Sequence, residues 1–219
     1  MAQPRKTVPY SPAEEICNAI THGTGALISI AGLIFLIIHS GTYGQAGHIA
    51  GSAVFGLSLV LLYTASTLYH SFQKTEIKRV LRVIDHCCIY VLIAGTYTPF
   101  MLLVVRGTLG WIIFALVWSL SVFGIVFKTF FIDRFKVIST LAYIGIGWLV
   151  VFAAGPLFQA LPGRGIAWLV TGGLAYTLGT IFYAWRTLPF NHAVWHLFVL
   201  CGSICHFMAV FFYVIPAKA

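Results

Sequence analysis

The sequence predicts an all-α fold: an integral membrane bundle of seven transmembrane helices, with a cytoplasmic N-terminus and the C-terminus outside. Of its 219 residues, 60% are hydrophobic and only 8% are charged, whereas a soluble domain carries about 25% charged residues. A core of this size could not hide so much apolar surface, so lipid is the expected solvent. We expect one membrane domain over residues 1–219, of which residues 1–10 form a short disordered tail.

Long apolar segments are the second observation behind this fold. A helix needs about 20 apolar residues to cross the bilayer core, whereas the strands of an outer-membrane barrel alternate over about 10 residues. Most of the segments reach the helical length, and the fifth is the short one. The expected spans are Ile20–His39, Ile49–Tyr69, Cys87–Val105, Trp111–Phe131, Val137–Ala154, Gly165–Trp185 and His192–Val214.

The distribution of basic residues predicts the orientation. With the N-terminus inside, the outside segments hold only Arg106, Arg164 and Lys218. Lys and Arg concentrate in cytoplasmic loops, so we expect a multi-pass protein of the cell inner (plasma) membrane. The aqueous loops are too short to form a nucleic-acid surface, which excludes that class of partner. The inside segments hold Arg5, Lys6, Lys74, Lys78, Arg79, Arg82, Lys128, Arg134, Lys136 and Arg186.

The first span is preceded by a helix start. In Ser11–Glu14, Ser can cap the helix, Pro suits the first position and Glu completes a capping box. Glu15, Asn18 and His22 follow at i, i+3 and i+7 and therefore share one helix face. They could orient the ligands of a neighbouring metal site or pair with basic residues. The alternative is an ordinary interfacial helix end with acidic residues near its N-terminus.

The second and third spans bring further polar residues to the same depth. Ser66 and His70 lie at i, i+4 near the inner end of the second span, and Asp85 opens the third span. The segment between them, Lys74–Asp85, predicts either a basic amphipathic turn at the inner leaflet or a plain loop. Pro99 is expected to kink or locally open the third helix.

Glycines of the fifth and sixth spans could mark faces where helices approach closely. They are Gly145, Gly147, Gly172, Gly173 and Gly179.

The last span begins with two histidines at i, i+4, His192 and His196, which project from one helix face so that both could bind one metal ion. His206 lies about 21 Å further along the helix axis, too far for the same ion. It faces the same interior, and with Ser203 it could line a cavity.

Four of these residues point to metal chemistry. His70, Asp85, His192 and His196 come from three different helices but share one depth, and ionisable groups in a membrane mark functional sites. Three imidazoles with an open fourth position are the pattern of catalytic zinc. Zn²⁺ lowers the pKa of bound water to about 7. Asp85 could take the water's proton, and Ser66 could support it. The expected substrate is a lipid amide or ester.

The motifs together resemble the hemolysin III family, the bacterial branch of the progestin and adiponectin receptor (PAQR) superfamily. The resemblance implies a seven-helix bundle with an inner N-terminus and zinc bound by histidines matching His70, His192 and His196. It also implies an aspartate that reaches the metal through water, which Asp85 matches, and hydrolysis of a ceramide-like amide in membrane homeostasis. The motifs are Glu15-x-x-Asn18-x-x-x-His22, Ser66-x-x-x-His70, Asp85-His-Cys-Cys-Ile-Tyr, Gly95-Thr-Tyr-Thr-Pro99 and His192-x-x-x-His196 with His206.

Two other functions remain open from the sequence. One is a non-enzymatic membrane sensor or regulator in which zinc is a structural clamp between the second and seventh helices. The other is a haemolysin that damages target-cell membranes. A pore former should show an amphipathic or releasable segment, and this chain is apolar throughout.

Overall fold

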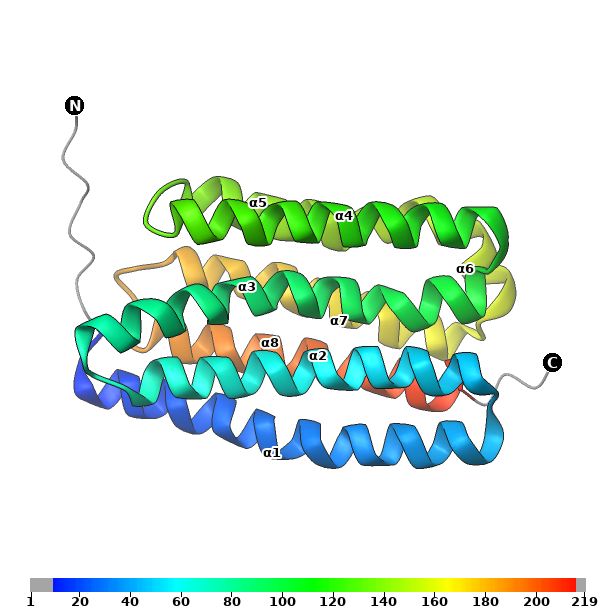
Figure 1. The fold of residues 1–219 in the computed structure, drawn as a ribbon, viewed down its shortest axis with the longest axis horizontal. Helices are drawn as coiled ribbons and strands as arrows, with labels where there is room; N and C mark the ends of the chain where they lie inside the picture. The colour runs from blue at the N-terminus through cyan, green and yellow to red at the C-terminus, as the bar shows by residue number, and fades with distance from the viewer. Residues whose placement is uncertain (1–9, 216–219) are drawn as a thin grey trace.

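The computed structural model describes residues 10–215 as long helices running along one axis (Figure 1). Seven candidate spans are found within these residues, which confirms the all-α prediction and fits a seven-span membrane bundle. The predicted tail lies, apart from Tyr10, outside the described residues. The spans are Pro12–Tyr43 (α1), Ala46–Ser71 (α2), Thr75–Val105 (α3, Thr75–Pro99, with η1, Phe100–Val105), Gly107–Phe131 (α4), Lys136–Ala160 (α5, Lys136–Gly147; η2, Trp148–Ala153; α6, Ala154–Ala160), Gly163–Ala184 (α7) and Asn191–Val214 (α8, Asn191–Ala209, with η3, Val210–Val214).

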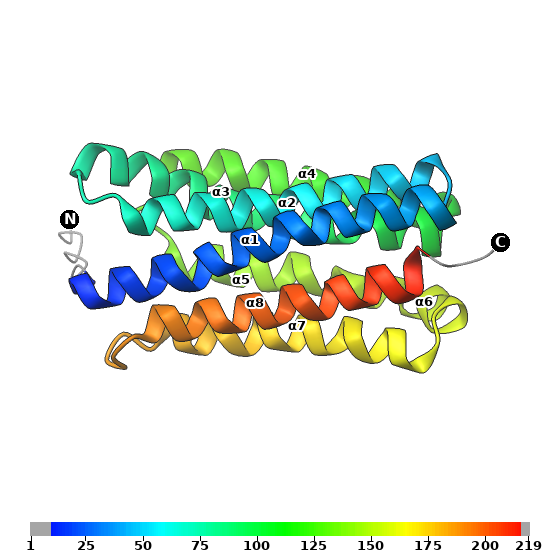
Figure 2. The ribbon, with the colours of Figure 1, turned by 90° about the horizontal axis from the view of Figure 1, so that it is seen from below.

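The helices pack as a ring around an internal space. Neighbours in sequence pack against each other, and α1 closes the ring by packing against α8 as well as α2. Figure 2 shows α1 lying between α2 and α8, the first helix beside the last. The described chain starts and finishes at opposite ends of the bundle. The connections α2–α3, α4–α5 and α7–α8 share the end at which α1 begins.

The start of α1 follows the predicted capping box. The Ser11 hydroxyl accepts a hydrogen bond from the Glu14 N–H at 3.3 Å, and the Ser11 N–H donates to Glu14 Oε2 at 2.8 Å. Two backbone N–H groups that the helix leaves without partners are thereby satisfied. The cap fixes the point at which α1 starts and therefore the rotation of Glu15, Asn18 and His22 toward the bundle, where all three are buried.

The basic segment before Asp85 is part of a transmembrane helix. We expected either a separate turn or a plain loop, but α3 begins at Thr75 and continues through Asp85 without a break. The basic side chains therefore occupy the first turns of the span. At its other end α3 gives way at Pro99 to the π-helical η1, which confirms that this proline locally opens the helix.

The fifth span is longer than the sequence suggested. It was expected to be short and to end at Ala154, but helix continues to Ala160 through a 3₁₀ segment between α5 and α6. The tighter 3₁₀ segment follows Gly147 and accommodates Tyr97, whose hydroxyl donates to the Ile146 and Gly147 carbonyls. Apolarity alone missed the last turn because Gly155 and Pro156 interrupt the aliphatic pattern.

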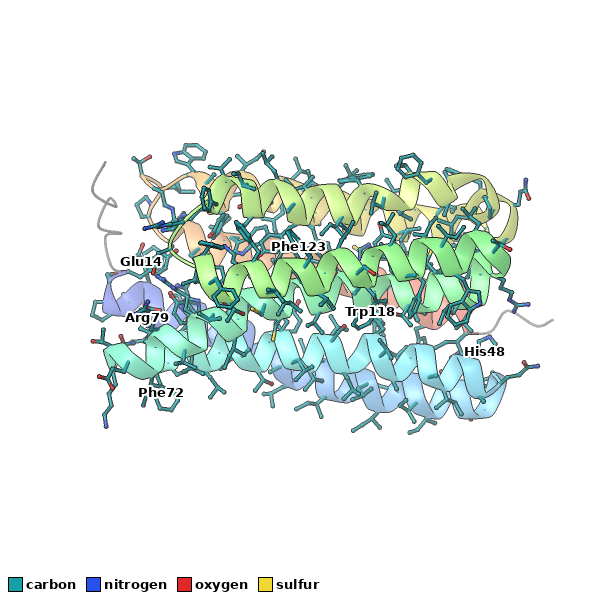
Figure 3. The ribbon with its side chains drawn as sticks, turned by 45° about the horizontal axis from the view of Figure 1, so that its top comes forward. Glu14, His48, Phe72, Arg79, Trp118 and Phe123 are labelled. Atoms are coloured by element: carbon teal, nitrogen blue, oxygen red, sulfur yellow. The ribbon has the colours of Figure 1, made fainter. Side chains whose placement is uncertain are left out.

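Outward-facing side chains along the bundle are mostly apolar, as Figure 3 shows for Phe123 on α4, which is 69% exposed. The labelled Glu14, Phe72 and Arg79 lie at one end, and His48 lies at the other. An apolar band between polar ends is the surface expected of a protein that uses lipid as its solvent.

Glycines permit some of the close helix contacts. A Cβ on Gly172 would meet the His206 ring at 2.5 Å, and one on Gly179 would meet Phe198 at 2.7 Å, as predicted. Gly145 and Gly147 have no atom within 4 Å of such a Cβ, so the expectation of close approach at these two positions was wrong.

Gly95→Ala is expected to destabilise the protein by about 1–3 kcal/mol, the usual cost of overpacking a filled site. A Cβ at residue 95 would lie 2.3 Å from Ser58 Oγ and 3.3 Å from the Val54 carbonyl, which would push α2 and α3 apart. The midpoint of thermal unfolding in detergent measures the effect. Gly145→Ala is the matched control, and a Gly95→Ala protein as stable as this control would contradict the packing argument.

Candidate metal centre

Three histidines from two helices meet inside the bundle. His70 lies near the end of α2, and His192 and His196 lie one turn apart at the start of α8. Each is buried, and each offers a ring nitrogen such that the three nitrogens lie within 4.8 Å of one another. Two nitrogens bound to one Zn²⁺ are at most about 4.2 Å apart. The group could therefore hold a metal ion after a small side-chain adjustment.

Hydrogen bonds prepare His70 to offer its other nitrogen. Its Nδ1 lies 2.6 Å from Glu15 Oε2 on α1, and Lys78 Nζ on α3 lies 2.8 Å from the other oxygen of that carboxylate. An Nδ1–H that donates to a carboxylate leaves the lone pair on Nε2. His70 Nε2 is buried and has no hydrogen-bond partner among residues 10–215, which fits a nitrogen directed at an ion.

His196 is oriented by the same face of α1. Its Nδ1 lies 3.2 Å from the Asn18 carbonyl, to which it can donate, and 3.1 Å from Thr21 Oγ1. The His196 lone pair is then on Nε2, as for His70. His22 stacks on His196 with ring centroids 3.4 Å apart, and its own edge contacts Tyr63. Glu15, Asn18 and Thr21 of α1 thus contact candidate ligand side chains of other helices.

Asp85 and Ser66 lie beside this group without belonging to it. Both line a cavity of about 250 Å³ together with His22, His192 and His196. Ser66 Oγ is buried and lacks a hydrogen-bond partner in the described part of the chain, so its hydroxyl is available to a ligand.

His86, the neighbour of Asp85 in the sequence, contacts the Asp85 carboxylate. Its Nδ1 lies 3.3 Å from Asp85 Oδ2 and 2.9 Å from the Arg82 carbonyl. The i, i+1 spacing points the two Cβ atoms apart, but the longer side chains still meet.

Of the two other polar residues predicted to line the cavity, His206 is on the cavity wall and Ser203 is not among the lining residues. Ser203 accepts a hydrogen bond from the Tyr63 hydroxyl at 2.7 Å and is 2.8 Å from the Tyr176 hydroxyl. His206 Nε2 donates to the Leu169 carbonyl at 3.1 Å. These contacts cross between helices deep in the bundle. His206 is therefore a hydrogen-bonded interior residue away from the three-histidine group.

Tyr10 covers the group at the end of the bundle. Its ring centroid lies 5.0 Å from that of His192, and its hydroxyl accepts a hydrogen bond from Arg186 Nη1 at 3.3 Å. Burial raises the pKa of Tyr10 to about 12, so the phenol stays neutral at physiological pH. The Phe190 N–H, just before α8, donates to Glu14 Oε1 at 3.0 Å. The start of α1 is thereby fastened to the loop that leads into the histidines.

Comparison with known proteins shows the family of this chain. The family model described as haemolysin-III related matches residues 10–207. The chain belongs to the haemolysin-III family. It is 51% identical over 206 residues to Hemolysin-3 of Bacillus cereus, covering 94% of both chains. It is 52% identical over 204 residues to the Hemolysin-3 homolog of Bacillus subtilis (strain 168), covering 93% of this chain and 96% of that one.

A more distant relative lies outside the bacteria. The human monocyte to macrophage differentiation factor is 28% identical over 170 residues, which cover 73% of this chain and 68% of that protein. No solved structure matches the chain.

Two residues that contact this haemolysin-III site were not named as site residues from the sequence. Thr21 bonds His196, and Lys78 pairs with Glu15. Thr21 lies at i+3 from Asn18, so helical spacing placed it on the same face, but threonine is too common in membrane helices to be singled out. Lys78 was interpreted as part of a basic amphipathic turn or of a plain loop, because its helix was not expected to begin so early.

Glu15→Gln is expected to weaken metal binding by about 10–100-fold, the usual cost of removing a carboxylate that orients a metal-bound histidine. The amide cannot stabilise the His70 Nδ1–H as a carboxylate does. A competition titration with a chromophoric chelator measures the affinity. Glu76→Gln, an exposed residue of the first turn of α3, is the control, and equal affinities in both variants would remove Glu15 from this role.

Proposed function

We propose that this haemolysin-III protein is a zinc-dependent membrane hydrolase that acts on lipid amides or esters. The observation that carries the proposal is the buried group of His70, His192 and His196, with one ring nitrogen of each within 4.8 Å of the others. Three imidazoles from two helices, two of them oriented by hydrogen bonds from a third, are a donor set that suits zinc.

A bound Zn²⁺ would supply a Lewis acid and a water whose pKa is lowered to about 7. The protein's own groups handle the proton and the substrate. Asp85 lies outside the group of mutually close nitrogens but lines the same cavity as His192 and His196. This placement supports a role as general base that accepts a proton from water, rather than a role as fourth ligand.

Ser66 and the cavity wall would position the substrate. The Ser66 hydroxyl, free of other partners within residues 10–215, can donate a hydrogen bond to the carbonyl oxygen as negative charge develops there. Beyond the polar end, the cavity wall is mainly apolar and includes Ile93, Leu157 and Phe158. An acyl chain would be sheltered along this wall, with its amide or ester bond at the polar end.

Orientation is part of the proposal. The end of the bundle that holds the three histidines also holds the basic connections, among them the exposed Lys74 and Arg79. Because basic loops remain in the cytoplasm, this charge distribution supports a cytoplasmic N-terminus and a centre close to the cytoplasmic face. The substrate would then come from the inner leaflet.

A structural zinc clamp is the second candidate. The three histidines join α2 to α8, so that an ion could fasten two helices without any catalysis. The unpartnered Ser66 hydroxyl and the ionisable Asp85 on the same cavity favour hydrolysis, because a clamp requires neither.

Incubation of the purified protein with ceramide, or with a phospholipid, tests hydrolysis directly. Release of free fatty acid that is abolished by a zinc chelator and restored by added zinc is the expected result. A protein that contains zinc and unfolds at a lower temperature without it, yet cleaves neither lipid, would favour the clamp.

A further inference from the structure

Lys128 is a buried cation that has no role in the proposed metal centre. It lies in the last turn of α4 and is only 2% exposed, and it lines the same cavity as Asp85 and His192. Lysine is almost never buried without a charged partner. The basic character of this end of the bundle does not explain it, because the positive-inside tendency requires charges in loops rather than inside the protein.

The acidic side chains of residues 10–215 do not offer Lys128 an ion pair. The five acidic side chains all lie within residues 10–215, and none of them forms an ion pair with Lys128. Asp133, in the loop that follows α4, pairs with Arg82 instead. Glu15 pairs with Lys78. Lys128 thus lines the cavity without an ion-pair partner among the described residues.

A second cation stands beside it on the cavity wall. Lys136, the first residue of α5, lines the cavity and, like Lys128, has no ion pair among the residues described. Thr140, one turn further along α5, and Tyr183 on α7 add hydroxyl groups to the same lining. Two cations and two hydroxyl groups at one end of an apolar cavity form a receptor for an anion that carries an apolar tail.

We propose that Lys128 and Lys136 bind the phosphate of an anionic lipid whose acyl chains occupy the cavity. Phosphate suits two ammonium groups better than a carboxylate does, because it carries more charge and more acceptor oxygens. In a glycerophospholipid the acyl ester lies a few bonds from the phosphate. A phosphate at the lysines would therefore bring an ester toward Asp85, and this part of the inference rests on the proposed function.

Lipid binding can be measured without any hydrolysis. Native mass spectrometry of the purified full-length protein in mild detergent would compare dioleoyl phosphatidate with dioleoylglycerol, which has the same acyl chains and no phosphate. We expect phosphatidate to bind at least about tenfold more tightly, as the loss of one charge-assisted hydrogen bond implies. Lys128→Gln should remove this preference, Lys136→Gln should reduce it and Lys128→Arg should retain it.

Lys74→Gln is the matched control, since it removes one exposed positive charge from the same end of the bundle. Equal binding of the two lipids to the wild type, or an equal loss in Lys74→Gln and Lys128→Gln, would overturn the inference. If Lys128→Gln fails to fold, an unchanged preference in Lys136→Gln overturns it. Inorganic phosphate should not compete, and displacement of the lipid by millimolar phosphate would assign the site to the free ion and overturn the lipid assignment.

The hydrolase proposal and the phosphate-site proposal can be refuted independently of each other. Phosphatidate binding that persists after chelation, in a protein that hydrolyses nothing, would refute the hydrolase alone. Hydrolysis of neutral lipids without any preference for phosphatidate would refute the phosphate site alone.

Discussion

Replacing His192 by alanine is expected to reduce zinc affinity by more than about 100-fold. Loss of one hydrogen bond to a ligand already costs about 10–100-fold, and this change removes one of three candidate ligands outright. Wild-type protein purified without chelator should contain about one zinc per chain, and the variant should contain essentially none. Elemental analysis measures the content, and competition with a chromophoric chelator measures the affinity.

His206→Ala is the matched control for this experiment. Like His192→Ala, it removes one buried histidine from α8 and leaves a similar space. His206, however, is hydrogen-bonded to the Leu169 carbonyl and does not belong to the three-histidine group. Its zinc content should remain that of the wild type. Wild-type protein without bound metal would refute both the hydrolase and the clamp proposals. An equal loss of zinc in the two variants would indicate general damage to the bundle.

Asp85→Asn is expected to lower hydrolysis by about 10²–10⁴-fold, the range typical of a lost general base. Asparagine has the same shape but cannot accept the proton of water. Because Asp85 lies outside the group of mutually close nitrogens, zinc content and the midpoint of thermal unfolding should change little. Fatty-acid release, elemental analysis and thermal unfolding of one preparation give the three quantities.

Asp133→Asn is the control, because it also removes one carboxylate from this end of the bundle but breaks only the surface pair with Arg82. Its activity should match that of the wild type, as exposed pairs contribute little. Full activity in Asp85→Asn would exclude Asp85 as the base. Joint loss of zinc and activity would instead make it a metal ligand.

Local rules made much of the fold predictable. The cap at Ser11 and the opening of the helix at Pro99 follow from the chemistry of one or two residues. The pairing of His192 with His196 follows from helical spacing. The 3₁₀ segment within the fifth span depends instead on how Tyr97 packs against α5 and η2, which no single-helix pattern contains.

In the candidate site, too, some features follow from local rules and others are decided by how the helices pack. Helical faces put Glu15, Asn18 and His22 together on α1, but which ligand each of them contacts is decided by how α1 packs between α2 and α8. The burial of Lys128 was likewise hidden, since a lysine near the end of a span ordinarily extends its ammonium to the interface. Its inward position results from the packing of α4 and α5 around the cavity.

The contact between the first and last membrane helices bears on biogenesis. Glu15 and Asn18 are synthesised and inserted early, whereas His192 and His196 leave the ribosome only after six other spans have been made. During that interval His70 can already be held by Glu15, but it lacks its two companion histidines. The three-histidine group therefore forms in one late step, when α8 docks against α1. Termination of translation before residue 192 would leave a membrane protein with no such group at all, rather than one with a weakened version of it.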